Sequence, residues 1–174
     1  MALLVLAYPR IAQTDFEWLQ AIRAQHDRRY FSLVAPHFTL VFPVTGLGQT
    51  DLIAHVRRQA AGVRAISFRA RCAVVVEDDT KKFSHVFLVP DEGFSEIVKL
   101  HDRLYAELLA PELRLDITFI PHIGVGNDEQ AHECKRLADE LNQQNFCLAG
   151  ELDTLDVVGY EHNEVRPLER IRLG

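Results

Sequence analysis

The sequence predicts an α+β fold in which two lobes, each a β-α pseudo-repeat, form a single domain over residues 1–174. Three observations support this prediction. Helix-like and strand-like segments alternate in both halves of the chain, consecutive strand-like segments fill the middle, and no stretch rich in Gly, Ser or Pro separates two independent domains. Neither G-x-G-x-x-G nor a P-loop occurs, which argues against a dinucleotide-binding or P-loop NTPase fold.

The first segments predict a strand followed by a helix. Leu3–Ala7 is almost entirely apolar and is followed closely by Pro9, which is typical of a buried strand. Residues 13–27 repeat apolar side chains at helical spacing, and Thr14 or Asp15 is a suitable N-cap. We therefore expect β-α at the start of the chain.

The same order follows once more before the pattern changes. Phe38–Phe42 is strand-like and leads into a glycine-containing loop, and a helix capped by Thr50 or Asp51 is expected to run to about Ala61. Residues 66–77 and 84–90 predict an antiparallel hairpin. Two helices are then expected at 91–109 and 127–145, separated by a strand at 119–126, and the tail, 146–173, predicts two or three final strands.

Composition and charge restrict the class of protein. With 48% hydrophobic and 25% charged residues the chain should be a soluble globule, and no apolar run is long enough to span a membrane. The net charge of −6 makes a broad electrostatic grip on a long nucleic acid improbable but leaves room for a small anionic ligand. Three widely spaced cysteines form neither a disulfide framework nor a zinc motif. We expect a cytoplasmic protein.

Two segments of the chain resemble one another. Both APHFTLVFPV (35–44) and FIPHIGVG (119–126) place a histidine directly after a proline and before an apolar run. Because successive side chains of a strand alternate between its faces, His37 and Thr39 should share one face while their neighbours enter the core. In the second segment His122 would share a face with Gly124.

Two imidazoles facing one another suit attack on a phosphodiester. One neutral ring can accept a proton from the attacking water, while the other, charged, donates one to the leaving oxygen. Thr39 could then donate a hydrogen bond to a phosphate oxygen, and neither a metal nor another cofactor is required. The simpler alternative is that His37 and His122 are each an ordinary, partly buried histidine bonded to a loop.

The motifs His37-Phe38-Thr39-Leu40 and His122-Ile123-Gly124-Val125 resemble the paired His-x-Thr/Ser-x motifs of the two-histidine (2H) phosphoesterase superfamily. This group includes the bacterial RNA 2′,3′-cyclic phosphodiesterases, often named 2′-5′ RNA ligases. The resemblance implies a bilobal fold with two antiparallel sheets flanking a central cleft and helices outside. It also implies hydrolysis of a 2′,3′-cyclic phosphate, with His37 as general acid, His122 as general base and Thr39 binding phosphate.

The second motif departs from the family pattern, because Gly124 lacks the hydroxyl group. Its backbone N–H could still approach a phosphate, since no Cβ intervenes. The substrate would be a small nucleotide or an RNA 3′ end, bound by a monomer. Two alternatives stay open: a module that binds a nucleotide or RNA end with weak or lost catalysis, and a 2′-5′ RNA ligase.

Other polar residues are assigned weaker roles or none. Arg10 and the Lys81-Lys82 turn are candidates for steering an anion, although solvated surface charge explains them more simply, and Tyr8 could stack on a base or pack at a strand end. Turn and strand-edge positions explain the acidic pairs Asp78-Asp79 and Asp153 with Asp156. No site role is assigned to the remaining histidines: His26, His55, His85, His101, His132 and His162.

Overall fold

The computed structural model describes residues 1–78, 80 and 82–174. Its strands are β1 (Ala2–Ala7), β2 (Arg10–Ile11), β3 (Phe38–Val44), β4 (Ile66–Glu77), β5 (Ser84–Glu92), β6 (Ile123–Asp128), β7 (Leu148–Leu152), β8 (Thr154–Glu161) and β9 (Glu164–Arg172). Its helices are α1 (Gln13–His26), α2 (Gln49–Ala60), α3 (Phe94–Leu104), the 3₁₀ helix η1 (Glu107–Glu112) and α4 (Ala131–Gln143).

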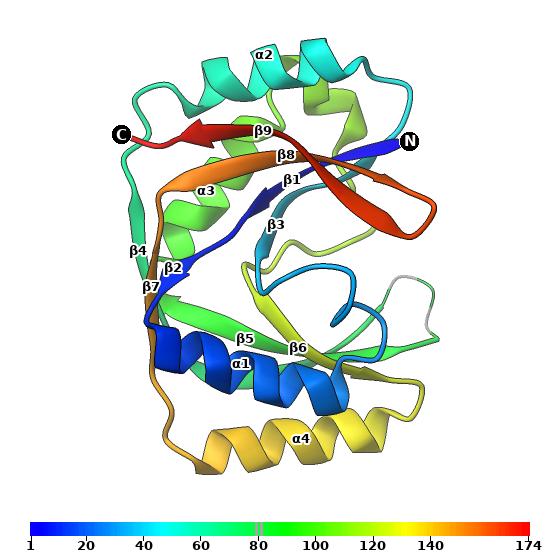
Figure 1. Cartoon of the computed structure of the whole chain (residues 1–174), viewed down its shortest axis with the longest axis vertical. Coiled ribbons are helices and arrows are strands. Elements are labelled where there is room, and N and C mark those ends of the chain that lie inside the picture. Colours follow the sequence, from blue (N-terminus) through cyan, green and yellow to red (C-terminus); the bar gives the residue numbers. More distant parts are fainter. Residues whose placement is uncertain (79, 81) are drawn as a thin grey trace.

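The strands form two sheets in which every neighbouring pair is antiparallel (Figure 1). Sheet A has the order β3-β1-β8-β9, and sheet B has the order β2-β7-β4-β5-β6. The expected α+β fold with two antiparallel sheets is therefore confirmed. The strands that follow the two Pro-His pairs, β3 and β6, lie at an edge of sheet A and an edge of sheet B respectively.

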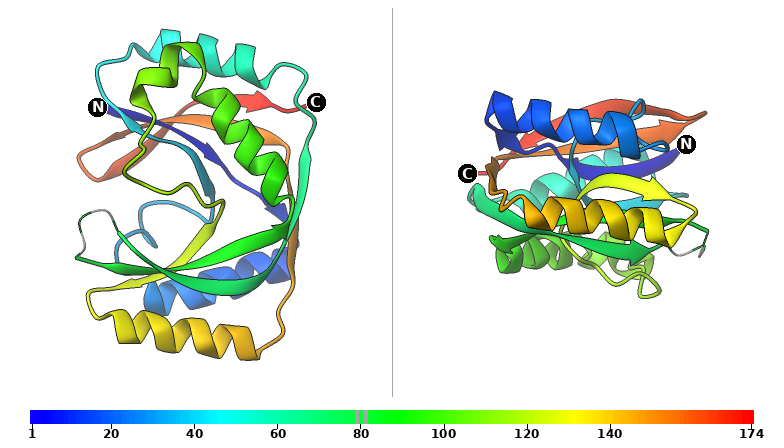
Figure 2. Two further views of the ribbon diagram at one scale, coloured as in Figure 1. Left: turned by 180° about the vertical axis from the view of Figure 1, so that it is seen from behind. Right: turned by 90° about the horizontal axis from the view of Figure 1, so that it is seen from below.

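Helices cover the outer sides of both sheets. Helix α2 packs on sheet A, and α1 and α4 pack on sheet B (Figures 1 and 2). Helix α3 contacts α2 and strands of both sheets: β3, β4 and β5. A single apolar cluster includes buried residues of both sheets, and within it the rings of Phe38 and Phe68 meet edge to face at 5.1 Å. Because both sheets pack on this one core, the position of β3 relative to β6 is fixed.

Some helix boundaries differ from those expected. Helix α1 begins at Gln13 because the carbonyl of Ala12 accepts hydrogen bonds from the backbone of Asp15 and Phe16, so neither Thr14 nor Asp15 is the N-cap. In the same way Gly48, not Thr50 or Asp51, is the N-cap of α2.

Helix α3 ends earlier than the apolar pattern predicts. It stops at Leu104, and the expected remainder is the 3₁₀ helix η1. The ring of Tyr105 is buried at this point, and its hydroxyl accepts a 3.0 Å hydrogen bond from the backbone N–H of Phe42 in β3. Tertiary packing of Tyr105 thus ends the α-helix at a point where the apolar periodicity alone predicts that it continues.

Candidate active site

His37 lies immediately before β3. Its Nδ1 donates a 2.8 Å hydrogen bond to the carbonyl oxygen of Ala35, two residues back. Phe38 and Leu40 are buried in the core while His37 and Thr39 stay partly exposed, which agrees with the predicted alternation of faces. Since the carbonyl can only accept, Nδ1 carries the proton of the neutral ring and Nε2 is left to act as an acceptor or base.

His122 repeats this arrangement in front of β6. Its Nδ1 donates a 2.5 Å hydrogen bond to the carbonyl oxygen of Ile120, again two residues back. Ile123 and Val125 are buried, whereas His122 and Gly124 are partly exposed. Both Pro-His segments therefore fix their imidazoles by the same local hydrogen bond, and both leave Nε2 for a ligand.

The pKa values of both histidines are lowered. The pKa of His122 is lowered to about 4, mainly because burial disfavours the charged ring, and positive charge on His37 and His85 lowers it further. The pKa of His37 is also lowered, again chiefly by burial. Without a ligand both rings are neutral near pH 7, and a bound anionic phosphate would favour protonation of either.

A row of aromatic rings leads along sheet B to His122. The ring of His122 stacks on Phe87 with centroids 3.5 Å apart and planes 13° apart. Phe87 is followed by His85 at 5.7 Å, and His85 by Tyr30 at 6.3 Å. Phe87 is the cross-strand partner of Gly124, so the row lies beside the second motif.

Sequence reasoning assigned no role to His85 and did not single out Phe87. The pattern that could have revealed them is the alternation along β5, in which Val86 and Leu88 are core residues and the intervening side chains point the other way. His85 also lies 4.0 Å from Asp78, measured from Nε2 to Oδ2.

Space is available at Gly124. A Cβ added there would meet no atom within 4 Å, so nothing in the described structure prevents a side chain at this position. By contrast, a Cβ at Gly126 would come within 2.7 Å of Leu137 Cδ2 and 3.2 Å of the Cβ of His26. The missing hydroxyl of the second motif is therefore not imposed by packing.

A buried ionic network joins the segment before His37 to β6. The guanidinium of Arg23 binds the carboxylate of Asp27 and the carbonyl oxygens of Tyr30 and Val34. Asp27 in turn accepts a 2.6 Å hydrogen bond from Asn127 Nδ2, at the far end of the strand that begins beside His122. These contacts tie both histidine-bearing segments to one framework.

The suggested anion-steering residues have varied surroundings. Arg10 forms an ion pair with Glu151, and its Nε lies 3.3 Å from Asp153 Oδ2, so two acids already offset its charge. Lys82 is exposed, whereas Lys81 and Asp79 lie outside the described residues. The ring of Tyr8 is partly exposed with its centroid 6.1 Å from that of His37.

One acidic residue needs a different explanation from that suggested by sequence. Asp156 is 2% exposed and lies on β8, an internal strand of sheet A, so it is not a strand-edge acid. Its Oδ1 accepts a 2.8 Å hydrogen bond from Arg170 Nε, and its Oδ2 is buried without a hydrogen-bond partner among the described residues.

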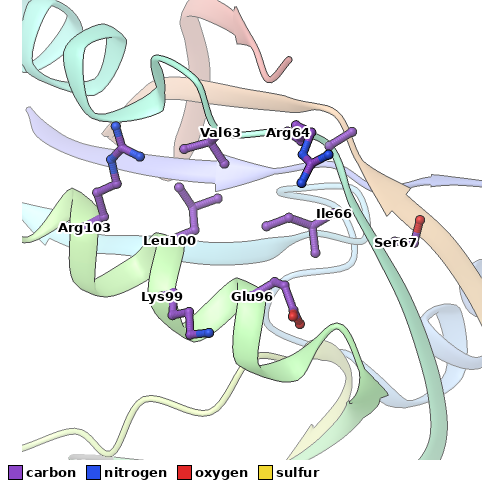
Figure 3. Close-up of a pocket in the computed structure, with 9 residues that line it drawn as sticks. Val63, Arg64, Ile66, Ser67, Glu96, Lys99, Leu100 and Arg103 are labelled. Carbon is purple, nitrogen blue, oxygen red and sulfur yellow. The ribbon is translucent and has the colours of Figure 1, made fainter.

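A pocket of about 580 Å³ lies elsewhere, between α3 and residues 63–67 (Figure 3). Arg64, Lys99 and Arg103 surround it, and neither proposed catalytic histidine lines it. Within the part of the chain that the structure describes, no three His, Cys, Asp or Glu side chains are grouped as metal ligands, and no helix is long and apolar enough to cross a membrane.

The α+β fold and the paired histidine segments are those of the two-histidine phosphoesterase superfamily. The chain belongs to the 2′-5′ RNA ligase superfamily, whose family model matches residues 9–164. It is 26% identical over 131 residues to the Geobacillus sp. (strain WCH70) protein named "Putative phosphoesterase", an alignment that spans 74% of this chain and 72% of that protein.

Solved structures share the fold at low sequence identity. E. coli LigT complexed with 3′-AMP superposes with a TM-score of 0.56 and 15% identity, covering 99% of this chain and 97% of that one. Usb1 of Kluyveromyces marxianus superposes with a TM-score of 0.58 and 8% identity, covering 99% and 98%. At these identities the likeness extends to the fold alone.

Proposed function

We propose that the protein is a metal-independent phosphoesterase that hydrolyses the 2′,3′-cyclic phosphate of an RNA end or a small nucleotide. The observation that carries this proposal is the matched geometry of His37 and His122. Each ring donates Nδ1–H to the carbonyl two residues back and leaves Nε2 for a ligand, and positive charge on His37 lowers the pKa of His122. Membership of the superfamily and the nucleotide bound to E. coli LigT support the same chemistry.

In the proposed reaction the histidines take the acid and base roles that the family resemblance implies, and the low pKa of His122 suits its role as the base. His122, with the pKa of about 4, is neutral over most of the pH range and accepts a proton from the attacking water. A P–O bond forms to that water while the bond from phosphorus to the 3′-oxygen breaks. His37, protonated next to the anionic phosphate, donates its Nε2 proton to the leaving 3′-oxygen, so that a 2′-phosphate remains.

Thr39 is proposed to donate a hydrogen bond to a non-bridging phosphate oxygen. It lies on the same face of β3 as His37, and such a bond to a charged acceptor contributes roughly 1.5–3 kcal/mol. Gly124 can offer only its backbone N–H in the second motif. Loss of one side-chain donor should reduce turnover about ten- to a hundredfold without abolishing it.

Two other functions would use the same residues. A nucleotide- or RNA-end-binding module with weak or lost catalysis is favoured by the one specific departure at Gly124. A 2′-5′ RNA ligase would open the same cyclic phosphate with a 5′-hydroxyl in place of water, so that a 2′-5′ phosphodiester forms and the 3′-oxygen leaves.

Phosphorus NMR of 2′,3′-cyclic AMP incubated with the protein tests these functions together. We expect the cyclic phosphate signal to be replaced by that of adenosine 2′-phosphate, and Ala substitution of His37 or His122 to prevent the change. A phosphodiester signal that grows only when a 5′-hydroxyl oligonucleotide is added would support ligation instead. No turnover at high protein concentration, with wild type equal to His37→Ala, would leave the binding module.

A further inference from the structure

A row of four side chains, three of them polar, crosses sheet A beside the proposed catalytic residues. The register pairs Thr39 with Leu6, Leu6 with Asp156, and Asp156 with Arg170, so these four side chains lie on one face of the sheet. The neighbouring residue on β9, Glu169, pairs with Arg57 of α2. The row therefore occupies the face opposite α2, which is also the face of Thr39.

Asp156 is an unusual residue for the middle of this face. Its side chain is almost fully buried, yet it makes a single side-chain hydrogen bond, to Arg170 Nε, and its other oxygen has no partner among the described residues. Burying a carboxylate this way is costly unless it is paired. The pairing with Arg170 offsets that cost and fixes the direction of the guanidinium.

Arg170 is in turn available to a ligand. Its side chain is 66% exposed, and within the described part of the chain only Nε of its guanidinium is engaged. The two terminal nitrogens keep the planar, forked donor set that binds phosphate. A cation fixed by a buried acid and open on its outer side is suited to recognising an anion.

The distance between β3 and β9 places Arg170 away from the phosphate that would react at His37. Neighbouring strands lie about 4.8 Å apart, so the Cα atoms of Thr39 and Arg170, three strands apart, are roughly 14 Å from one another. Because the guanidinium reaches back to Asp156 on β8, it lies about two strand spacings, or roughly 10 Å, from β3. That distance exceeds the width of one phosphate group.

Tyr8 directly follows β1, the strand that runs between β3 and β8. Its ring centroid is 6.1 Å from that of His37, and its pKa is raised by burial and then by the negative charge of Asp156. Nucleobases stack on aromatic side chains of this kind in single-stranded RNA recognition. If the base of the terminal nucleotide stacks on Tyr8, its ribose would link the cyclic phosphate near His37 to a second phosphate near Arg170.

We propose that Arg170, held by Asp156, binds the phosphodiester on the 5′ side of the terminal nucleotide, which is the phosphate next to the cyclic phosphate along the RNA. The preferred substrate is therefore an RNA 3′ end. This inference rests on the proposed function and selects between its two substrate classes. A free cyclic nucleotide has no second phosphate to place at Arg170. One local cation also suits a short RNA end on a chain whose net charge is −6.

The kinetic test compares 2′,3′-cyclic AMP with the dinucleotide ApA carrying a 2′,3′-cyclic phosphate. For Arg170→Gln we expect kcat/KM to fall about tenfold for the dinucleotide, through KM, and less than twofold for cyclic AMP. Arg57→Gln is the matched control, because it removes the same charge from an ion pair on the opposite face of β9. Equal losses for both substrates in Arg170→Gln would overturn the proposal.

A binding test keeps the inference separate from hydrolysis. The affinity of a labelled RNA trinucleotide ending in a 2′-phosphate is measured by fluorescence anisotropy at several salt concentrations. Arg170→Gln should weaken binding about tenfold and reduce the slope of log K against log salt by about 0.7, whereas Arg170→Lys should retain most of the slope. If neither substrate is hydrolysed but this difference is found, the subsite stands and the proposed reaction fails. Identical binding by wild type and Arg170→Gln would overturn the subsite.

Discussion

Phe87 and His122 lie face to face, with ring centroids 3.5 Å apart and planes 13° apart. The phenyl ring covers one side of the imidazole, and burial is the largest cause of the low pKa of His122. The stack on Phe87 is therefore one contact that contributes to the burial that lowers the pKa of the proposed base.

Replacing Phe87 with Leu should raise the pKa of His122 from about 4 towards 6.5, because water then reaches the uncovered face of the ring. Histidine NMR titration measures this pKa directly, and we expect an increase of about one unit or more. Val89→Ala, two residues along the same strand, is the control. An unchanged pKa in Phe87→Leu would show that the stack does not tune the base.

The pH dependence of kcat/KM should be bell-shaped with its maximum between about 4 and 6.5. The base must be neutral, so activity rises as pH increases through the pKa of His122. The acid must be charged, so activity falls as pH increases through the lowered pKa of His37. Phe87→Leu should move only the acidic limb, and movement of both limbs together would contradict the separate assignments.

Gly124→Thr should raise kcat/KM about tenfold by returning a hydroxyl donor to the second motif. A Cβ at this position meets no atom within 4 Å, so the substitution should not disturb folding. Gly126→Thr provides the contrast, because its Cβ would lie 2.7 Å from Leu137 Cδ2 and should destabilise the protein. If Gly124→Thr folds normally and is no faster, the missing hydroxyl does not limit the reaction.

Asn127→Leu should lower both stability and turnover. It removes the 2.6 Å hydrogen bond to Asp27 Oδ1 inside the buried network, a loss of about 2 kcal/mol in the free energy of unfolding measured with urea. Because Asp27 belongs to the segment that leads to His37, kcat should also fall. Gln130→Ala, in the turn after β6, should leave both quantities nearly unchanged.

The parts of the fold that depend on local pattern were predictable. Alternation placed Phe38 and Leu40 in the core and left His37 and Thr39 on the other face, as the structure shows. Helical periodicity found the four α-helices, but it extended α3 beyond Leu104, where a long-range hydrogen bond to Tyr105 takes over.

The surroundings of the site depend on contacts between distant segments, which the sequence does not reveal. Asp156 looked like a surface acid because its ion pair with Arg170 requires the β8-β9 register. Similarly, the sequence gives no sign that His85 is near the site. The pairing of β5 with β6 places Phe87 beside Gly124, and the ring of His85 stacks on that of Phe87. The two Pro-His motifs were enough to propose the catalytic residues. The residues that surround them, such as Phe87 and Arg170, could be placed only once the pairing of the strands was known.

The central claim is that His37 and His122 bind one phosphate between them. Histidine side-chain NMR during titration with adenosine 2′-monophosphate tests it most directly, with signals assigned from His37→Gln and His122→Gln and exposed His132 as the internal reference. We predict that both site histidines shift with one common dissociation constant and that both gain protonation, while His132 does not respond. Shifts with different dissociation constants, or a response from only one of the two rings, would contradict a shared site.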